Sequence, residues 1–241
     1  VLYHNMAAFI RAAGGRVTGM LWYQGESDVG ADLAATYLGR FTRFVERFRA
    51  DFGADLPVLT AQLNRVLGAD AGAQEGWSRV REAQRQAALR LAQLAVVPTT
   101  DLPLSDIIHT SAAGNVLLGQ RFALAALGLH YGVDGAWRAV DVVDARFLDA
   151  ERRIARFEFA PVTDHLISLT NEPQGFVMAD AAGPIAIAKA RLVGDAAVEL
   201  TLARAAGAEA RGSYLSGADP VGTLRDHLQR PLLAFHGVAV R

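Results

Sequence analysis

The chain has 241 residues, with 24 Lys and Arg against 25 Asp and Glu, 51% hydrophobic residues and no Cys. This composition predicts a globular chain with a sizeable core and excludes a disordered tail. The balanced charge argues against binding to nucleic acid or to acidic membranes. The lack of Cys excludes disulfides, thiolate metal sites and thiol catalysis. No uninterrupted apolar run approaches the roughly 18 residues of a membrane helix.

The first half of the chain alternates between helical and extended patterns. In 31–52 the apolar residues recur every three or four positions, which predicts an amphipathic helix. Residues 6–13 are predicted to be the apolar end of a helix that stops at Gly14 and Gly15, further helices are predicted over 31–52, 77–94 and 112–129, and buried strands over 17–23, 57–63 and 95–100. Strands separated by helices predict a parallel sheet with helices on both faces, that is, an α/β fold.

From about Gly135 the pattern changes to short apolar runs separated by Gly, Pro, Asn and Asp. Phe157 and Phe159, for example, alternate with Arg156 and Glu158, which is typical of antiparallel strands with one polar face. Strands are predicted over 139–143, 154–159, 166–169, 176–178, 185–189, 198–202 and 213–215. We therefore expect an α/β domain over 1–133 and a β-sandwich domain over 134–241, with the boundary within 132–136.

The first candidate site is the segment W-Y-Q-G-E-S-D at 22–28, at the carboxyl end of a predicted parallel strand. Ligands of open α/β sheets bind at such ends. Gln24 supplies an amide, Gly25 an unhindered backbone N–H and Glu26 a carboxylate. The alternative is a plain turn, in which Ser27 or Asp28 caps the following helix and Glu26 is merely solvated.

The second candidate site lies between the third strand and the last helix of the first half. Asp106 and His109 stand three residues apart there, so the carboxylate can accept the imidazole N–H and stabilise an imidazolium. The alternative is a helix-capping Asp beside a surface His.

Other polar residues carry weaker signals. Arg81 and Glu82 lie off the apolar stripe of their helix, which predicts a solvated face. Trp77 and Trp137 are expected to pack in the core or between domains. No metal or cofactor is expected, because the remaining histidines lack the spacing of metal ligands: His4, His130, His165, His227 and His236.

The two candidate sites in this order resemble the SGNH-hydrolase superfamily and, more narrowly, the sialate O-acetylesterase family of carbohydrate esterases. Segments 77–84 and 108–115 also resemble family segments, and 175–177 and 224–226 resemble the sandwich that follows the catalytic domain in many members. The resemblance implies a three-layer, flavodoxin-like SGNH domain in the first half. It also favours a periplasmic or secreted protein, and the preference for Arg over Lys indicates a bacterial source.

The resemblance also implies roles for the residues of both sites. His109 would act as general base and then acid, and Asp106 would orient it. Gln24 and Gly25 would lie near the oxyanion hole, and Glu26 would support their loop. The reaction would remove O-acetyl groups from sialic acid or a polysaccharide by acyl transfer through a serine.

The family's nucleophile is the Ser of a G-Q-S-N motif, which this sequence lacks. Of the serines present, only Ser27 follows a predicted strand; they are Ser27, Ser78, Ser105, Ser111, Ser168, Ser213 and Ser216. We therefore expect the nucleophile on a segment upstream of Val1 or on a partner chain, and only part of an SGNH domain in this chain. The sheet should then have an uncovered edge, and the 241 residues alone should not be an active, stable esterase.

Two other functions fit the same residues. The chain could be a non-catalytic carbohydrate-binding or adhesin module, for instance in a phage tail or a surface assembly, that retains the fold. It could also be a lipase-like or peptidase-like SGNH enzyme that acts on another acyl group.

Overall fold

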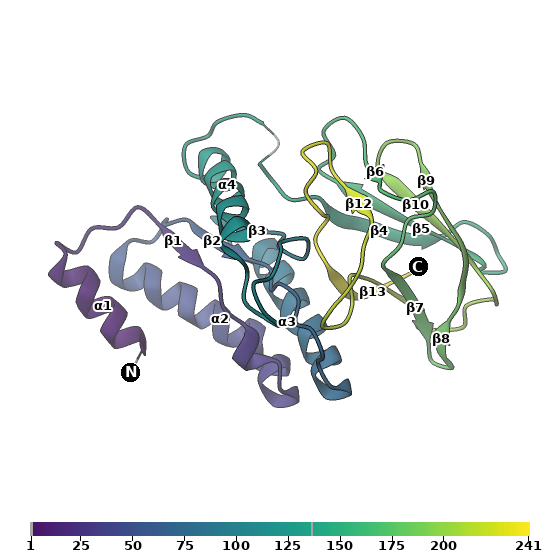
Figure 1. Cartoon of the computed structure of the whole chain (residues 1–241), viewed down its shortest axis with the longest axis horizontal. Coiled ribbons are helices and arrows are strands. Elements are labelled where there is room, and N and C mark those ends of the chain that lie inside the picture. The colour runs from purple at the N-terminus through teal and green to yellow at the C-terminus, as the bar shows by residue number, and fades with distance from the viewer. Residues whose placement is uncertain (1, 136) are drawn as a thin grey trace.

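The computed structural model describes residues 2–135, here called the α/β half, and residues 137–241, the β half. Helices and strands alternate in the α/β half (Figure 1). The elements are α1 (Leu2–Ala12), β1 (Met20–Trp22), the 3-10 helix η1 (Glu26–Asp28), α2 (Ala31–Phe52), β2 (Val58–Ala61), α3 (Ala71–Arg90), β3 (Leu94–Val97) and α4 (Ala112–Leu129).

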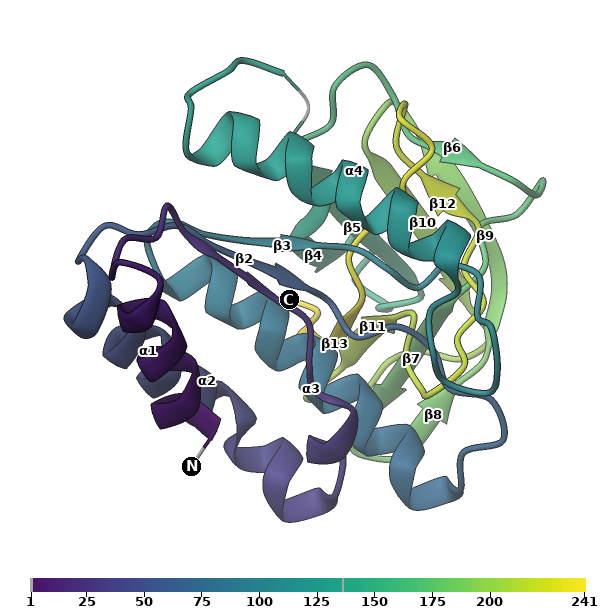
Figure 2. The same cartoon turned by 60° about the vertical axis from the view of Figure 1, so that its left-hand side comes forward.

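The three strands of the α/β half form a parallel sheet in the order β1-β2-β3. Helices α1, α2 and α3 lie on one face of this sheet and α4 on the other (Figures 1 and 2). Val58 packs towards α2 and α3, whereas its neighbour Leu59 packs towards α4. Successive residues of a strand point to opposite faces, so each face of β2 has its own core.

Strand β1 forms an edge of the sheet, and within the described residues no strand pairs with its outer side. Leu21 shares a face with Leu59, its partner in the ladder, but it is 64% exposed because α4 covers β2 and β3 instead. The α/β half therefore has the uncovered sheet edge that its sequence predicts.

Helix bounds agree with the sequence-based predictions at α2 and α4 but not at α3. Helix α3 begins well before Trp77, at Ala71, because the Asp70 side chain accepts a hydrogen bond from the N–H of Ala73 at 2.8 Å and caps the helix. It ends at Arg90, and Leu94 belongs to β3 instead of the helix.

Helix α4 has the length and mean hydropathy, 1.2, of a membrane span. Its one charged side chain, Arg121, is buried and forms a bidentate ion pair with Asp101, with both N–O distances 2.7 Å. The helix packs on β2 and β3 through Leu118, Phe122 and Ala125. It thus forms one layer of the α/β half, and a single apolar helix is weak evidence for a span.

The β half contains two four-stranded antiparallel sheets, ordered β4-β5-β10-β9 and β13-β11-β7-β8, and a two-stranded ribbon β12-β6. Phe157 and Val198 from the first sheet pack against Tyr214 and Phe235 from the second in one apolar core. The strands are β4 (Asp141–Phe147), β5 (Ile154–Ala160), β6 (Ile167–Ser168), β7 (Phe176–Asp180), β8 (Gly183–Ile185), β9 (Ile187–Val193), β10 (Ala197–Leu202), β11 (Arg211–Tyr214), β12 (Leu224–Arg225) and β13 (Phe235–Ala239).

The predicted fold class, a parallel α/β layer followed by an antiparallel β-sandwich, is confirmed. The predicted boundary within 132–136 falls between α4 and β4, and Ala136 itself lies outside the described residues. The division into two domains stays a prediction. Trp137 packs on α4 so closely that a Cβ at Gly128 would lie 2.0 Å from its ring.

Helix α3 joins the two halves through polar side chains. The amide of Gln62, at the end of β2, exchanges two hydrogen bonds with the backbone of Ala234, at 2.8 and 2.9 Å. Arg85 pairs with Asp141 at the start of β4, at 3.0 Å. Arg81 is fully buried and Glu82 half-buried, so the predicted solvated face of α3 is wrong. These side chains face the β half instead of water.

Candidate active site at the carboxyl edge of the sheet

Both candidate sites follow the carboxyl ends of parallel strands. The segment Tyr23–Asp28 continues from β1, and the loop that holds Asp106 and His109 continues from β3 into α4. Because the strands are parallel, their carboxyl ends meet at one edge of the sheet, the position at which open α/β sheets bind ligands.

Asp106 and His109 are in direct contact. Nδ1 of the imidazole lies 2.7 Å from Oδ2 of Asp106. The His109 side chain is 76% exposed, and within the described part of the chain its Nε2 has no hydrogen-bond partner. The carboxylate thus faces one ring nitrogen and leaves the other open to a substrate. Such a pair can accept a proton at Nε2 and stabilise the resulting cation.

The Asp106 carboxylate is also held by the backbone of its own turn. Its Oδ1 accepts the N–H groups of His109, at 2.7 Å, and of Ile108, at 2.8 Å. These two backbone donors, and after them the imidazole, lower the pKa of Asp106 from 3.8 to about 2. Asp106 therefore remains an anion beside His109 throughout the neutral and mildly acidic range.

The helix-capping alternative for Asp106 is wrong. Helix α4 is capped by Ser111, whose hydroxyl accepts the N–H of Gly114 at 3.1 Å. The loop before this cap closes on itself, because the N–H of Ser105 donates to the carbonyl of His109 at 2.8 Å and Leu104 bridges to Thr110. His109 is therefore presented by a tight loop and not by a helix end.

The loop after β1 packs tightly against α3. A Cβ at Gly25 would lie 2.8 Å from Cγ1 of Val80, so only glycine fits this position without a shift. The N–H of Gly25 donates to the carboxylate of Glu26 at 2.9 Å. Glu26 therefore occupies the backbone donor that the resemblance assigns to an oxyanion, and this donor becomes available only when the Glu26 side chain turns away.

Gln24 is tied down at both its side chain and its backbone. Its Nε2 donates to Asp28 at 2.7 Å, and Asp28 in turn pairs with Arg40 of α2 at 2.8 Å. Its carbonyl accepts the Tyr37 hydroxyl at 2.9 Å and the Gln84 amide at 3.1 Å. The capping alternative for Ser27 and Asp28 is wrong here too, because α2 starts at Ala31 and its N-cap residue, Gly30, has no side chain to cap it.

Three residues to which the sequence analysis assigned no role join the two candidate sites, and Tyr23 is one that already lies in the first candidate segment. The Tyr23 hydroxyl lies 3.1 Å from Oγ1 of Thr110, the neighbour of His109. The same Thr110 oxygen accepts the amide of Asn64 at 2.9 Å. Tyr23 and Thr110 each stood next to a predicted site residue, and Asn64 follows β2 at the same sheet edge. That position was the available signal for Asn64.

No serine hydroxyl hydrogen-bonds the His109 ring in residues 2–135 and 137–241. Ser105 donates to the His109 carbonyl at 3.2 Å, Ser111 caps α4, and Ser27 lies exposed in η1. Ser78 and Ser216 bond each other at 3.0 Å. Each of the remaining two bonds its own partner in the β half: Ser168 with Thr223 and Ser213 with Gly237.

Comparisons with known proteins agree on one group of enzymes. The family described as carbohydrate esterase, sialic acid-specific acetylesterase, matches residues 1–128. A probable carbohydrate esterase of Arabidopsis thaliana is 36% identical over 121 residues, which covers 48% of this chain and 43% of the relative. The crystal structure of a carbohydrate acetylesterase from Xanthomonas citri matches with a TM-score of 0.77 and 27% identity, over 91% of this chain and 50% of that chain. The chain thus spans about half the length of these relatives.

Proposed function

Because the chain belongs to the carbohydrate esterase family of sialic acid-specific acetylesterases, we propose that it supplies the acid–base pair of an enzyme that removes O-acetyl groups from carbohydrates. The observation that carries this proposal is the Asp106–His109 pair, with 2.7 Å between carboxylate and Nδ1 and an open Nε2. Sialic acid and O-acetylated polysaccharides are the proposed substrates.

In the proposed mechanism, Nε2 of His109 takes the proton of a serine hydroxyl while the serine oxygen attacks the acetyl carbonyl carbon. Asp106 accepts the Nδ1–H and stabilises the imidazolium. The tetrahedral intermediate collapses as His109 returns the proton to the departing sugar oxygen. Water then repeats the sequence on the acetyl-enzyme and releases acetate.

The oxyanion would be held at the loop after β1, where Gln24 offers an amide and Gly25 a backbone N–H. For Gly25 to donate, Glu26 must release the N–H that it now accepts at 2.9 Å. Glu26 therefore supports the loop in the free state and gives way when the negative charge of the oxyanion develops.

We place the nucleophilic serine outside residues 1–241, on the same polypeptide or on a partner chain. Two observations support this. No serine among the described residues bonds the His109 ring, and the relatives are about twice as long as the segment that they share with this chain. The open edge of β1 is compatible with a further strand beside it.

The test is acetate release from acetylated sugars by the whole protein. We expect H109A and D106N to lower kcat/KM by about 10²–10⁴-fold, the usual contribution of general acid–base catalysis. The chain offers a matched control, because Nδ1 of His165 lies 3.1 Å from Asp164 in an exposed pair in the β half. H165A and D164N should leave the rate unchanged.

Three outcomes would contradict the proposal. Equal losses in H109A and H165A would mean that neither histidine is specific to the reaction. Preference for long acyl esters over acetyl esters would indicate a lipase-like enzyme. No acetate release, with glycan binding that survives H109A, would indicate a non-catalytic binding module.

A further inference from the structure

Arg81 of α3 is a fully buried cation without a carboxylate partner in the described part of the chain. Its guanidinium donates to backbone carbonyls, among them Leu63 at 2.7 Å and Asn64 at 2.8 Å. Burial lowers the pKa of Arg81 to about 9. An unpaired buried charge is costly, and an apolar side chain could fill the same space. Unlike an apolar side chain, the planar guanidinium group of an arginine can donate hydrogen bonds to several carbonyls at once.

The carbonyls around Arg81 come from both halves of the molecule. Leu63 and Asn64 belong to the loop after β2, which we call the β2 loop (residues 62–67). The other three belong to the segment after β11: Leu215 at 3.4 Å, Ala218 at 3.2 Å and Gly217. Leu215 is buried and has a φ of +54°, a left-handed conformation that is rare for a leucine. The segment that binds Arg81 therefore contains a residue, Leu215, in a strained backbone conformation.

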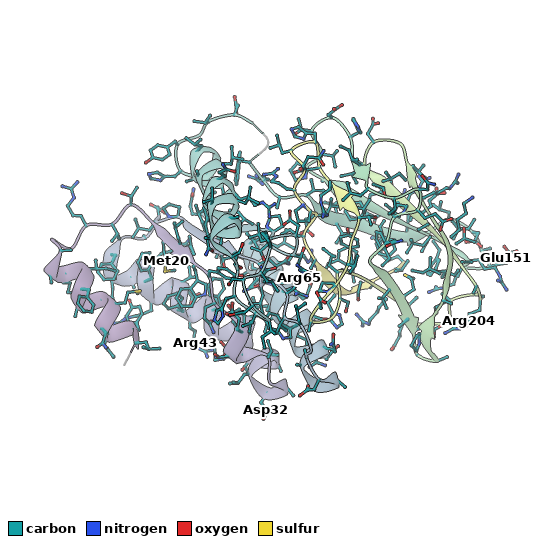
Figure 3. All side chains as sticks on the ribbon, viewed as in Figure 1. Met20, Asp32, Arg43, Arg65, Glu151 and Arg204 are labelled. Carbon is teal, nitrogen blue, oxygen red and sulfur yellow. The ribbon has the colours of Figure 1, made fainter. Side chains whose placement is uncertain are left out.

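Further contacts hold the β2 loop against the segment after β11. The N–H of Val66 donates to the carbonyl of Ala218 at 3.1 Å. Arg65 lies between the two halves in Figure 3, and its Nη1 is 3.1 Å from Oδ1 of Asp219. Arg81 adds to these contacts, because its guanidinium connects both the β2 loop and the segment after β11 to α3.

The β2 loop in turn makes hydrogen bonds to the loop that contains His109. One of these bonds lies on each side of the histidine in the sequence. Upstream, the N–H of Leu67 donates to the carbonyl of Ile107 at 2.8 Å. Downstream, the Asn64 amide donates to Oγ1 of Thr110 at 2.9 Å. The His109 side chain is 76% exposed, and its own turn fixes it only relative to Asp106 and Ser105. The β2 loop holds this turn as a unit against the rest of the α/β half.

We propose that Arg81 is a positioning residue through which the β half holds the His109 loop in its working geometry. The connection runs from the segment after β11 through the guanidinium to the β2 loop, and from there to Ile107 and Thr110. The catalytic part of this inference rests on the proposed role of His109. The structural part does not, because it concerns only where the imidazole is held.

The test compares R81M and R81K with a matched control, R85M. Arg85 lies one turn further along α3, is also buried and also joins the halves, but it pairs with Glu82 and Asp141 and donates no hydrogen bond to the β2 loop among the described residues. NMR spectra of histidine-labelled protein, with the His109 signal assigned by H109A, report the environment of the imidazole without any need for activity.

We expect both methionine variants to lower the melting temperature, but only the Arg81 variants to shift and broaden the His109 signal. R81K keeps the positive charge but loses the planar guanidinium group, so it should shift the His109 signal less than R81M does. In the whole protein, R81M should lower kcat for acetyl esters by about 10–100-fold with little change in KM, because a small displacement of a general base costs that much.

Two results would overturn the proposal. In the first, the His109 signal of the Arg81 variants matches that of the wild type. In the second, R81M and R85M change the signal equally, which would reduce Arg81 to a structural contact. A wild-type protein without esterase activity would instead overturn the proposed function, and the NMR comparison would still decide the role of Arg81.

Discussion

At the scale of single residues, the structure distinguishes two exposed Asp–His pairs. Asp106–His109 and Asp164–His165 are both exposed carboxylate–imidazole contacts. Only Asp106 also accepts two backbone N–H groups from its own turn, at 2.7 and 2.8 Å. Those donors fix the carboxylate whether or not the imidazole is present, so Asp106 can orient His109 and not merely follow it.

This difference predicts how Asp106 titrates. Because backbone donors are the largest cause of its lowered pKa, H109A should leave the pKa of Asp106 well below 3.8. The group's contribution to stability should be complete above its unfolded pKa of 3.8 and should vanish as the pH falls through about 2. Carbon-detected NMR titration of the carboxyl measures this directly. A return to an ordinary aspartate pKa in H109A would show that the imidazole, not the turn, sets the value.

At the scale of elements, the sequence predicted apolar faces better than buried polar ones. The bounds of α2 and α4 follow from apolar spacing and from the Gly and Ser residues at their starts. Strands β8, β12 and β13 were missed: the predicted strand 185–189 matches β9 and overlaps β8 only at Ile185, β12 has only two residues, and β13 contains Gly237 and lacks a clear alternation. The Asp106–His109 contact could be predicted from spacing within one loop.

The residues around the site were harder to predict, because their role depends on the β half. Arg81 lies off the apolar stripe of α3, where the helical period predicts solvent, yet it is fully buried among carbonyls of both halves. Gln84 is buried within the α/β half itself, where it bonds the carbonyl of Gln24 and the N–H of Leu63. A helical pattern reports where apolar atoms gather. It does not reveal a polar face that another part of the chain buries.

The close approach of α3 to the loop after η1 predicts opposite effects at two helical glycines. A Cβ at Gly76 would lie 1.7 Å from the carbonyl oxygen of Val29, whereas nothing lies within 4 Å of one at Gly119. G76A should therefore cost about 3 kcal/mol by overpacking, and G119A should gain up to about 1 kcal/mol from helix propensity. Urea denaturation of both variants gives the two values. A neutral G76A would mean that α3 can move away from this loop freely.

At the scale of the whole molecule, the two halves share a set of buried polar side chains along α3, here called the polar seam (Gln62, Arg81 and Arg85). Each of Gln62, Arg81 and Arg85 donates a hydrogen bond to a residue of the β half. Gln62 and Arg81 also donate to residues of the α/β half. Separating the halves would break these hydrogen bonds, each of which contributes about 0.5–1.5 kcal/mol. The family match confirms the resemblance to sialate O-acetylesterases over residues 1–128, and Arg81 of this half bonds the carbonyl of Ala218 in the β half.

The seam predicts that the halves unfold together. Calorimetry should give a single transition whose calorimetric enthalpy equals its van't Hoff enthalpy. R85M should lower the midpoint without splitting the transition, because Arg81 and Gln62 still hold the seam. Two separate transitions in the wild type would show that the halves are independently stable, and the proposed support of the His109 loop by the β half would then lose its basis.

In the proposed mechanism, His109 activates a serine that lies outside residues 1–241. The most direct measurement is to label the whole protein with a fluorophosphonate probe, which reacts with activated serines, and to locate the label by peptide mass spectrometry. We predict a single labelled serine outside these residues and no labelling in H109A. A label on Ser27 or any other serine within 1–241, labelling that persists in H109A, or no labelled serine in the wild type would contradict the claim.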